Sequence, residues 1–253
     1  MPSKLHVWNG ERAHVGRWRE LTGIAVIAPL PGAIPLSPEF IEQCCSVLRD
    51  DGYDRVVTPA LAQNELMPFM QAGFTTREQL FVLTHNLHGL RAPRLDGITL
   101  RRSRSSDLAR TLSVDAQAFD DFWRFDSESL GEACTATPQT RFRVAVSERR
   151  LENETRSLPA GLVLGYCIAG RSRHQGFLQR LAVAPEAQGL GIGSALVWDA
   201  LGWLFRRRSR TCIVNTQESN RRAMALYKAC GFVESPTGLH VLTLPLEPVE
   251  EFA

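Results

Sequence analysis

The residues best suited to chemistry lie in a short glycine-rich loop, Gln188–Ser194, which reads QGLGIGS. The apolar segment 181–185 precedes it and an amphipathic segment follows, so the loop is predicted to join a strand to a helix. Glycines at 189, 191 and 193 let the backbone approach an anion closely, and the free amides of the first helical turn add donors. The loop therefore predicts a site for a pyrophosphate group.

The elements that must position this loop follow from the sequence pattern after residue 96. Apolar alternation and capping residues predict the order β-α-(loop)-β-β-β-α-β-α-β. The predicted strands are 98–102, 141–147, 162–169, 176–183, 211–215 and 239–244. The predicted helices run from a cap at 105–107 to Phe119, from the glycine loop to the arginines at 206–208, and from Asn220 to Ala229. The polar, aromatic-rich segment 120–139 is predicted to be a short helix plus loop.

This order predicts an α/β protein with a mixed sheet. A Rossmann arrangement is excluded, because the glycines do not follow GxGxxG and antiparallel strands precede the loop. No Asp or Glu ends a following strand in the place where a ribose would be bound.

Two sequence motifs carry a resemblance to a known family. The segment 181–196, LAVAPEAQGLGIGSAL, resembles motif A of the GNAT superfamily of acyl-CoA N-acyltransferases, whose pattern is Q/R-x-x-G-x-G/A. The segment 220–232, NRRAMALYKACGF, is similar to motif B of that family, N-x-x-A-x-x-L-Y-x-x-x-G-F. The resemblance covers roughly 96–246 and implies a mostly antiparallel central sheet flanked by helices.

The resemblance also implies a co-substrate, acetyl-CoA, and the residues that bind it. Its pyrophosphate is expected on the backbone amides of the glycine loop. Its pantetheine arm is expected to pair with the backbone of the preceding strand, where the sheet splays open. The cofactor-binding residues expected on this basis are Leu181, Ala182, Val183, Gln188, Gly189, Leu190, Gly191, Ile192, Gly193, Ser194, Asn220 and Tyr227. No metal is expected.

Catalysis by this family implies a proton donor and a base. The resemblance places Tyr227 where it can protonate the leaving CoA thiolate, and a phenol that is neutral at pH 7 suits that role. The amine must also lose a proton, but neither motif indicates which residue accepts it. The candidate bases are Glu132, His174 and Glu218, together with Asp120, Asp121 and Asp126.

Each of these residues also has a purely structural interpretation. The glycine loop could be a simple β–α turn, Tyr227 a core aromatic, and Asn220 an N-cap. His174 lies in an Arg-rich stretch typical of a loop. The arginines of 206–210 fit a solvated helix end that complements the helix dipole. A covalent acetyl-cysteine route has little support, because no cysteine has a basic neighbour in sequence.

The N-terminal part repeats the second half of the C-terminal part. Residues 55–74 align without a gap on 213–232, so that Phe69 falls on Tyr227 and Phe74 on Phe232. The segment 24–29, IAVIAP, is similar to 181–185, LAVAP. A repeat of this kind indicates duplication. The sequence therefore predicts two domains, a truncated GNAT-like domain at 1–95 and a catalytic one at 96–253.

The first copy lacks the residues that would carry chemistry. Its loop after Pro29 reads LPGAIPLSPE, and proline has no N–H to offer an anion. Phe69 replaces the tyrosine and removes the proton donor. We expect this copy to bind no CoA. Its arrangement resembles that of tandem GNAT proteins of the mycothiol synthase type, with a shortened first half.

Composition bounds the class of protein. A formal net charge of +2 gives no indication of nucleic acid or of anionic lipid as a partner. The six cysteines form no CxxC pair, which favours reduced thiols in the cytoplasm. Neither a signal peptide nor a membrane span is expected. A monomer or a homodimer is expected.

The sequence thus predicts an N-acetyltransferase that moves an acetyl group from acetyl-CoA to a primary amine by direct attack in a ternary complex. The acceptor is a small molecule or a protein amine. The alternative is a catalytically silent acyl-CoA-binding or sensing module that regulates a partner. Retention of Tyr227 favours the enzyme.

Overall fold

The computed structural model describes residues 4–30, 32–91, 93, 95–153 and 156–246. These residues form two compact units. The first consists of the described parts of Met1–Val82, Thr216–Ser219 and Ser235–Ala253, and the second of Leu83–Asn215 and Asn220–Glu234. The chain therefore passes from one unit to the other several times. Two strands, β5 and β12, contribute residues to both.

The first unit is a sheet whose strands pair in the order β1-β2-β3-β4-β14-β5. Only β3 and β4 are parallel, with Ile24 opposite Arg55. The strands are β1 (Lys4–Trp8), β2 (Glu11–Arg17), β3 (Ile24–Pro29), β4 (Arg55–Val57), β5 (Thr75–His85) and β14 (Leu239–Pro245). The helices are α1 (Pro38–Asp50) and α2 (Leu66–Gln71), with a 3-10 turn at Gln63–Glu65.

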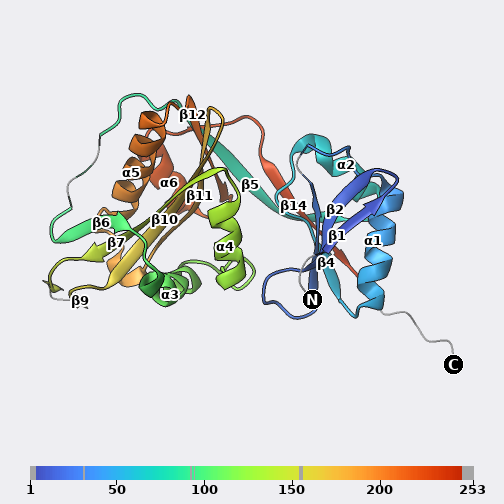
Figure 1. Cartoon of the computed structure of the whole chain (residues 1–253), viewed down its shortest axis with the longest axis horizontal. Coiled ribbons are helices and arrows are strands. Elements are labelled where there is room, and N and C mark those ends of the chain that lie inside the picture. The colour runs from blue at the N-terminus through green and yellow to red at the C-terminus, as the bar shows by residue number, and fades with distance from the viewer. Residues whose placement is uncertain (1–3, 31, 92, 94, 154–155, 247–253) are drawn as a thin grey trace. The chain divides into compact units, whose positions relative to one another are not determined.

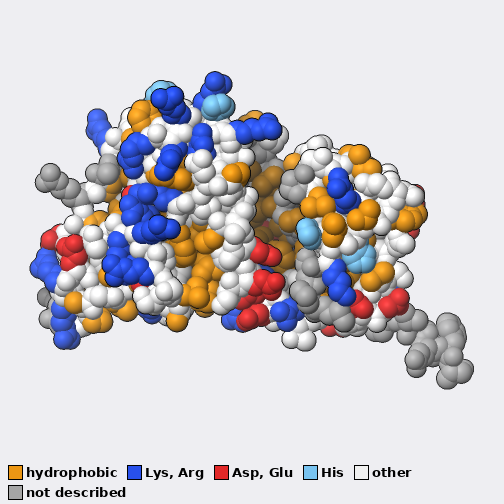
Figure 2. Space-filling view, in the orientation of Figure 1, with side chains coloured by type: hydrophobic (Ala, Val, Ile, Leu, Met, Phe, Trp, Pro, Cys, Tyr) orange, Lys and Arg blue, Asp and Glu red, His pale blue; other side chains and the backbone are white. Residues whose placement is uncertain are grey.

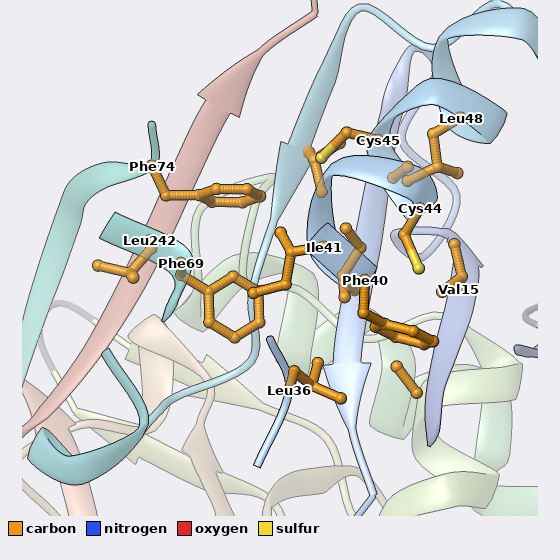
Figure 3. Packing of buried hydrophobic residues seen from close by; sticks show 14 of the residues in the cluster. Val15, Leu36, Phe40, Ile41, Cys44, Cys45, Leu48, Phe69, Phe74 and Leu242 are labelled. Atoms are coloured by element: carbon orange, nitrogen blue, oxygen red, sulfur yellow. The ribbon is translucent and has the colours of Figure 1, made fainter. Parts of the chain in front are cut away.

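The core of the first unit lies where α1 and α2 pack on this sheet. Figure 3 shows side chains of α1, among them Phe40 and Ile41, directed toward Phe69 of α2 and toward the strands. Both phenylalanines are almost fully buried, at 1% exposed. Phe69 meets Phe74 edge to face, with ring centroids 5.2 Å apart. Burial of this apolar surface holds the unit together.

The strands of the second unit pair in the order β12-β11-β10-β7-β6. Only β11 and β12 are parallel among them. The strands are β6 (Ile98–Arg102), β7 (Gln139–Ser147), β10 (Val163–Ser172), β11 (Gln175–Val183) and β12 (Thr211–Gln217). The short strands are β8 (Leu151–Asn153), β9 (Arg156–Leu158) and β13 (Val233–Glu234), and β13 pairs with the end of β5.

Helices cover both faces of the sheet in the second unit (Figure 1). They are α3 (Leu108–Ala118), α4 (Ser127–Thr135), α5 (Ile192–Arg206) and α6 (Arg221–Ala229), with 3-10 turns at Ser105–Asp107 and Pro185–Ala187. Asp115 of α3 bonds to Tyr166 of β10, whereas Asp199 of α5 pairs with Arg143 of β7. Tyr166 lies opposite Val144, one residue beyond Arg143. Because side chains alternate along a strand, α3 and α5 lie on opposite faces.

The predicted fold class is confirmed: a mixed, mostly antiparallel sheet is flanked by helices. All six strands predicted after residue 96 are present, with small shifts at their ends. The segment 120–139 contains one short helix, α4, as predicted. Between β7 and β10, the short strands β8 and β9 pair with each other in antiparallel fashion.

Candidate functional site

The glycine loop has the backbone geometry of an anion site. Gly191 is the N-cap residue of α5 and lies in the left-handed region, with φ 75°. Gly189 has φ 84°. No side chain caps the helix. The amides at the start of α5 are therefore available to a ligand, and the helix dipole favours a negative charge there.

The sheet opens beside this loop. The parallel pairs between β11 and β12 end at Phe177 opposite Ile213, while β11 continues to Val183. The half of β11 that includes Leu181 and Val183 therefore lacks that partner on its β12 side. An extended ligand can pair with exposed backbone groups of this kind.

Gly193 serves a different purpose from the two glycines before it. It lies inside the first turn of α5, and a Cβ atom there would come within 3.1 Å of Leu226 in α6. Its missing side chain therefore lets α5 and α6 approach each other. This contact brings the loop close to the helix that carries Tyr227.

Tyr227 is buried in α6 and is 6% exposed. Burial is the main cause that raises its pKa, the thiols of Cys167 and Cys212 raise it further, and the Arg180 guanidinium opposes them. Within the described part of the chain, the phenol oxygen forms no hydrogen bond. Tyr227 is thus a neutral donor at physiological pH whose proton is not engaged.

Asn220 caps the helix that carries Tyr227. Its side-chain oxygen accepts a hydrogen bond from the Ala223 amide at 3.0 Å. The structural interpretation of Asn220 is therefore correct. A contact between Asn220 and a cofactor stays a prediction.

An ion pair ties α3 to the turn just before the glycine loop. The Arg110 guanidinium donates to Glu186 at 2.6 Å and to the Val163 carbonyl at 3.2 Å. Glu186 lies in the 3-10 turn that leads into Gln188. These bonds limit the positions open to the loop. The pair was not predicted, because its partners are far apart in sequence.

A second unpredicted pair, Asp115 and Arg180, is buried in the same unit. Two bonds of 2.8 Å join the Arg180 guanidinium to both oxygens of the Asp115 carboxylate. Tyr166 also donates its hydroxyl to this carboxylate. Asp115 is 0% exposed and Arg180 9%. A bidentate pair in this setting is strong and directional.

This pair holds the aromatic segment between α3 and α4. Asp115 accepts the Phe125 amide at 2.6 Å, and Arg180 donates to the Trp123 carbonyl at 2.7 Å. The guanidinium lies 3.4 Å from the centroid of the Phe119 ring and 3.9 Å from that of Phe125. The pair therefore fixes residues 119–125 against β11 on the α3 face of the sheet.

The candidate bases occupy unrelated places. Glu132 is exposed on α4, and His174 is exposed in the turn between β10 and β11, at the end of β11 away from the glycine loop. Glu218 belongs to the first unit, where its amide donates to the Gln79 carbonyl. The three aspartates have local roles. Asp120 accepts the Trp123 amide, Asp121 pairs with Arg124, and Asp126 caps α4.

The first unit closes the corresponding helix N-terminus with its own side chains. Ser37 caps α1 and accepts the Phe40 amide at 3.2 Å. Both the amide and the hydroxyl of Ser37 donate to the Glu11 carboxylate, the latter at 3.0 Å. Glu11 is buried, at 7% exposed. A carboxylate of the chain thus already occupies the position at which a helix N-terminus binds an anion.

The second unit thus combines an uncapped glycine loop at the start of α5 with a buried tyrosine on the helix packed against it. The Acetyltransferase (GNAT) family model matches residues 116–232. Residues 116–232, a little under half of the chain, therefore belong to the GNAT superfamily.

Two curated acetyltransferases are similar in sequence to parts of this chain. A mycothiol acetyltransferase of Stackebrandtia nassauensis is 43% identical over 60 residues, which are 24% of this chain and 20% of that protein. A type 1 aminoglycoside N(6')-acetyltransferase of Stenotrophomonas maltophilia is 29% identical over 116 residues, 46% of this chain and 66% of that protein. The chain thus spans less than two thirds of either curated relative.

A solved structure extends the similarity of fold to nearly the whole chain. It is a tandem GNAT protein from the clavulanic acid biosynthesis pathway, with a TM-score of 0.68 and 13% identity. The match covers 95% of this chain and 79% of that one. In the part of the chain that the structure describes, no cluster of His, Cys, Asp and Glu is suited to a metal ion. Among the same residues, no helix is long and apolar enough to span a membrane.

Proposed function

We propose that the protein is an N-acetyltransferase that uses acetyl-CoA and a primary amine. The observation that carries this proposal is the unengaged phenol of Tyr227 on the helix that packs against the glycine loop. A catalytically silent binding module would have no need of a proton donor at this place, next to the helix that begins at the glycine loop.

In the proposed reaction the amine nitrogen attacks the thioester carbonyl, a C–N bond forms, and the C–S bond breaks. Tyr227 donates a hydrogen bond to the sulfur as negative charge develops on it. Because burial raises the pKa of Tyr227, the phenol is suited to hydrogen bonding more than to complete proton transfer. The amine loses a proton to water or to a side-chain base, and a proton reaches the CoA thiolate to form the thiol; Glu132, His174 and Glu218 remain the proposed candidates for the base.

The acceptor is proposed to reach the thioester beside residues 119–125. This segment is fixed by the Asp115–Arg180 pair on the face of β11 opposite α5. Amines of the aminoglycoside class belong in the first set to be tested, because a relative with matching residues is named for that substrate. Small diamines and peptide N-termini complete the set.

We also propose that residues 1–95 are a degenerate copy and that 96–253 form the catalytic domain. The support is a shared local geometry. The Phe74 amide donates to the Phe69 carbonyl at 3.0 Å, and the Phe232 amide donates to the Tyr227 carbonyl at 3.0 Å. Gly73 and Gly231, which precede Phe74 and Phe232, have φ 88° and 87°. One acetyl-CoA per chain is expected.

The proposed activity is tested by measuring release of the CoA thiol from acetyl-CoA in the presence of each amine of the set. In Tyr227→Phe we expect turnover to fall by about 100-fold, within the range for loss of a positioned proton donor. Acetyl-CoA affinity should change little, because only the hydroxyl is removed. Tyr53→Phe, in the first unit, is the matched control and should keep full activity. Absence of turnover with every amine, despite tight acetyl-CoA binding, would favour the silent module instead.

A further inference from the structure

The second unit contains an arginine-lined hollow beside β6 and β7, where residues of α3, α4 and α5 also line it. Its volume is about 650 Å³, within the usual range of small-molecule sites. Five arginines line it and no carboxylate does: Arg102, Arg104, Arg141, Arg143 and Arg207. Figure 2 shows Lys and Arg side chains gathered over this part of the molecule.

The sheet register brings these arginines together. Arg102, at the end of β6, lies opposite Arg143 of β7. Arg141 is two residues from Arg143, so both side chains emerge on the same face. Arg207 follows the last residue of α5, above that face. Arg207 alone would fit a helix end that complements the dipole, as the sequence suggested, but the other four arginines come from β6, β7 and the turn after β6.

The positive charge of the hollow is only partly neutralised. Asp199 forms two bonds of 2.8 Å to Arg141 and lies 3.4 Å from the Nε atom of Arg143. That Nε atom is buried without a hydrogen-bond partner. In the described part of the chain, the guanidinium groups of Arg102 and Arg207 form no ion pair, whereas the charge of Arg104 helps to lower the pKa of the nearby Asp107 carboxyl. The positive charges of Arg102 and Arg207 therefore face the hollow without a paired carboxylate among the described residues.

We propose that this hollow binds a small molecule carrying two or more phosphate groups. The planar guanidinium fork matches the geometry of phosphate oxygens, and several forks favour an anion with several such groups. The hydroxyls of Ser103, Ser105 and Thr140 also line the hollow and supply neutral donors. Such a ligand would act either as a regulator or as a second substrate.

This site is separate from the glycine loop. The loop lies at the start of α5 and the hollow at its C-terminal end, and a helix of 15 residues is about 22 Å long. The proposal therefore does not depend on the proposed acetyl-CoA site. Its test can exclude binding at the loop.

Calorimetry with inorganic tripolyphosphate at fixed salt tests the site. Wild type should show saturable binding, and Gly191→Glu, which is altered in the loop, should bind equally well. The double variant Arg102→Ala/Arg104→Ala should bind at least about tenfold more weakly. The double variant Arg12→Ala/Arg17→Ala removes two exposed charges from β2 as a matched control and should bind like wild type.

Three results would overturn the proposal: no saturable binding, unchanged binding in Arg102→Ala/Arg104→Ala, or loss of binding in Gly191→Glu. A single-stranded oligonucleotide distinguishes a free ligand from a nucleic-acid backbone. If it competes with tripolyphosphate and binds at least about tenfold more tightly, with a steep dependence on salt, the hollow belongs to a nucleic-acid surface and the small-molecule proposal is wrong.

Discussion

Glu11 accepts hydrogen bonds from both the backbone amide and the hydroxyl of Ser37, the residue that caps α1. In the second unit the corresponding helix, α5, begins at a glycine and has no side-chain cap. The two helix N-termini thus differ in what is available to a ligand. The first is occupied by the chain's own carboxylate, and the second is open.

The contact between Glu11 and Ser37 should contribute measurably to stability. Replacing Glu11 by alanine should lower the free energy of unfolding by about 1–3 kcal/mol, because the buried charge-assisted bonds from the capping residue Ser37 are lost. Urea denaturation measures this change. The matched control is Glu39→Gln, an exposed acid in the first turn of the same helix, which should change stability far less. Equal effects of the two substitutions would contradict the assigned role.

Asp115 should be among the least replaceable residues of the second unit. Asp115→Asn leaves the buried Arg180 guanidinium without its counter-charge, and loss of one partner of such a pair costs about 3–5 kcal/mol. Thermal and urea denaturation measure the loss. Asp121→Asn, which breaks the exposed pair with Arg124, should change stability by less than about 1 kcal/mol. A small effect at Asp115 would mean that the pair does not hold the segment 119–125.

Stability should depend on pH through His85. This ring is 3% exposed, its Nδ1 atom accepts the Leu87 amide at 2.8 Å, and it packs 5.1 Å from the Phe232 ring. Burial is the main cause that lowers the pKa of His85, and a bond to the Cys230 backbone opposes it. The neutral ring is therefore favoured in the folded protein.

The sign of the effect follows from proton uptake. The unfolded chain binds a proton at His85 near pH 6.5, whereas the folded chain binds it only at lower pH. The contribution of neutral His85 to the free energy of unfolding is therefore complete above pH 6.5 and decreases as the pH falls below that value. Unfolding free energies at pH 7.5 and 5.5 should therefore differ more in wild type than in His85→Gln. An equal or larger difference in the variant would contradict this origin.

Much of the candidate site could be predicted from the sequence, because it is local. The glycine loop and the helix of Tyr227 each lie within a short stretch, where spacing encodes geometry directly. The pairs that fix them could not be predicted. The two partners of each pair, Asp115 with Arg180 and Arg110 with Glu186, come together only after the sheet has formed. The sequence around one partner does not indicate which residue the other is.

The same reasoning explains the first unit. The prolines after Pro29 predict a loop that offers few amides to an anion, and this stays a prediction. That Glu11 would occupy the start of α1 could not be read from the sequence, because β2 reaches that helix only through the pairing of β2 with β3.

The central claim is that the open N-terminus of α5 binds the pyrophosphate of acetyl-CoA. Gly191→Glu places a negative charge beside the expected phosphates and forces a side chain into a left-handed conformation. Gly191→Ala introduces the backbone strain alone, and a Cβ there would lie 3.6 Å from Leu95, an ordinary contact. The two variants together separate charge from strain.

Calorimetric titration of acetyl-CoA into the three proteins tests this claim most directly. Wild type should bind one molecule per chain, Gly191→Ala should bind somewhat more weakly, and Gly191→Glu should lose at least about 100-fold in affinity while remaining folded by circular dichroism. Unchanged affinity in a folded Gly191→Glu variant would contradict the assignment of this loop.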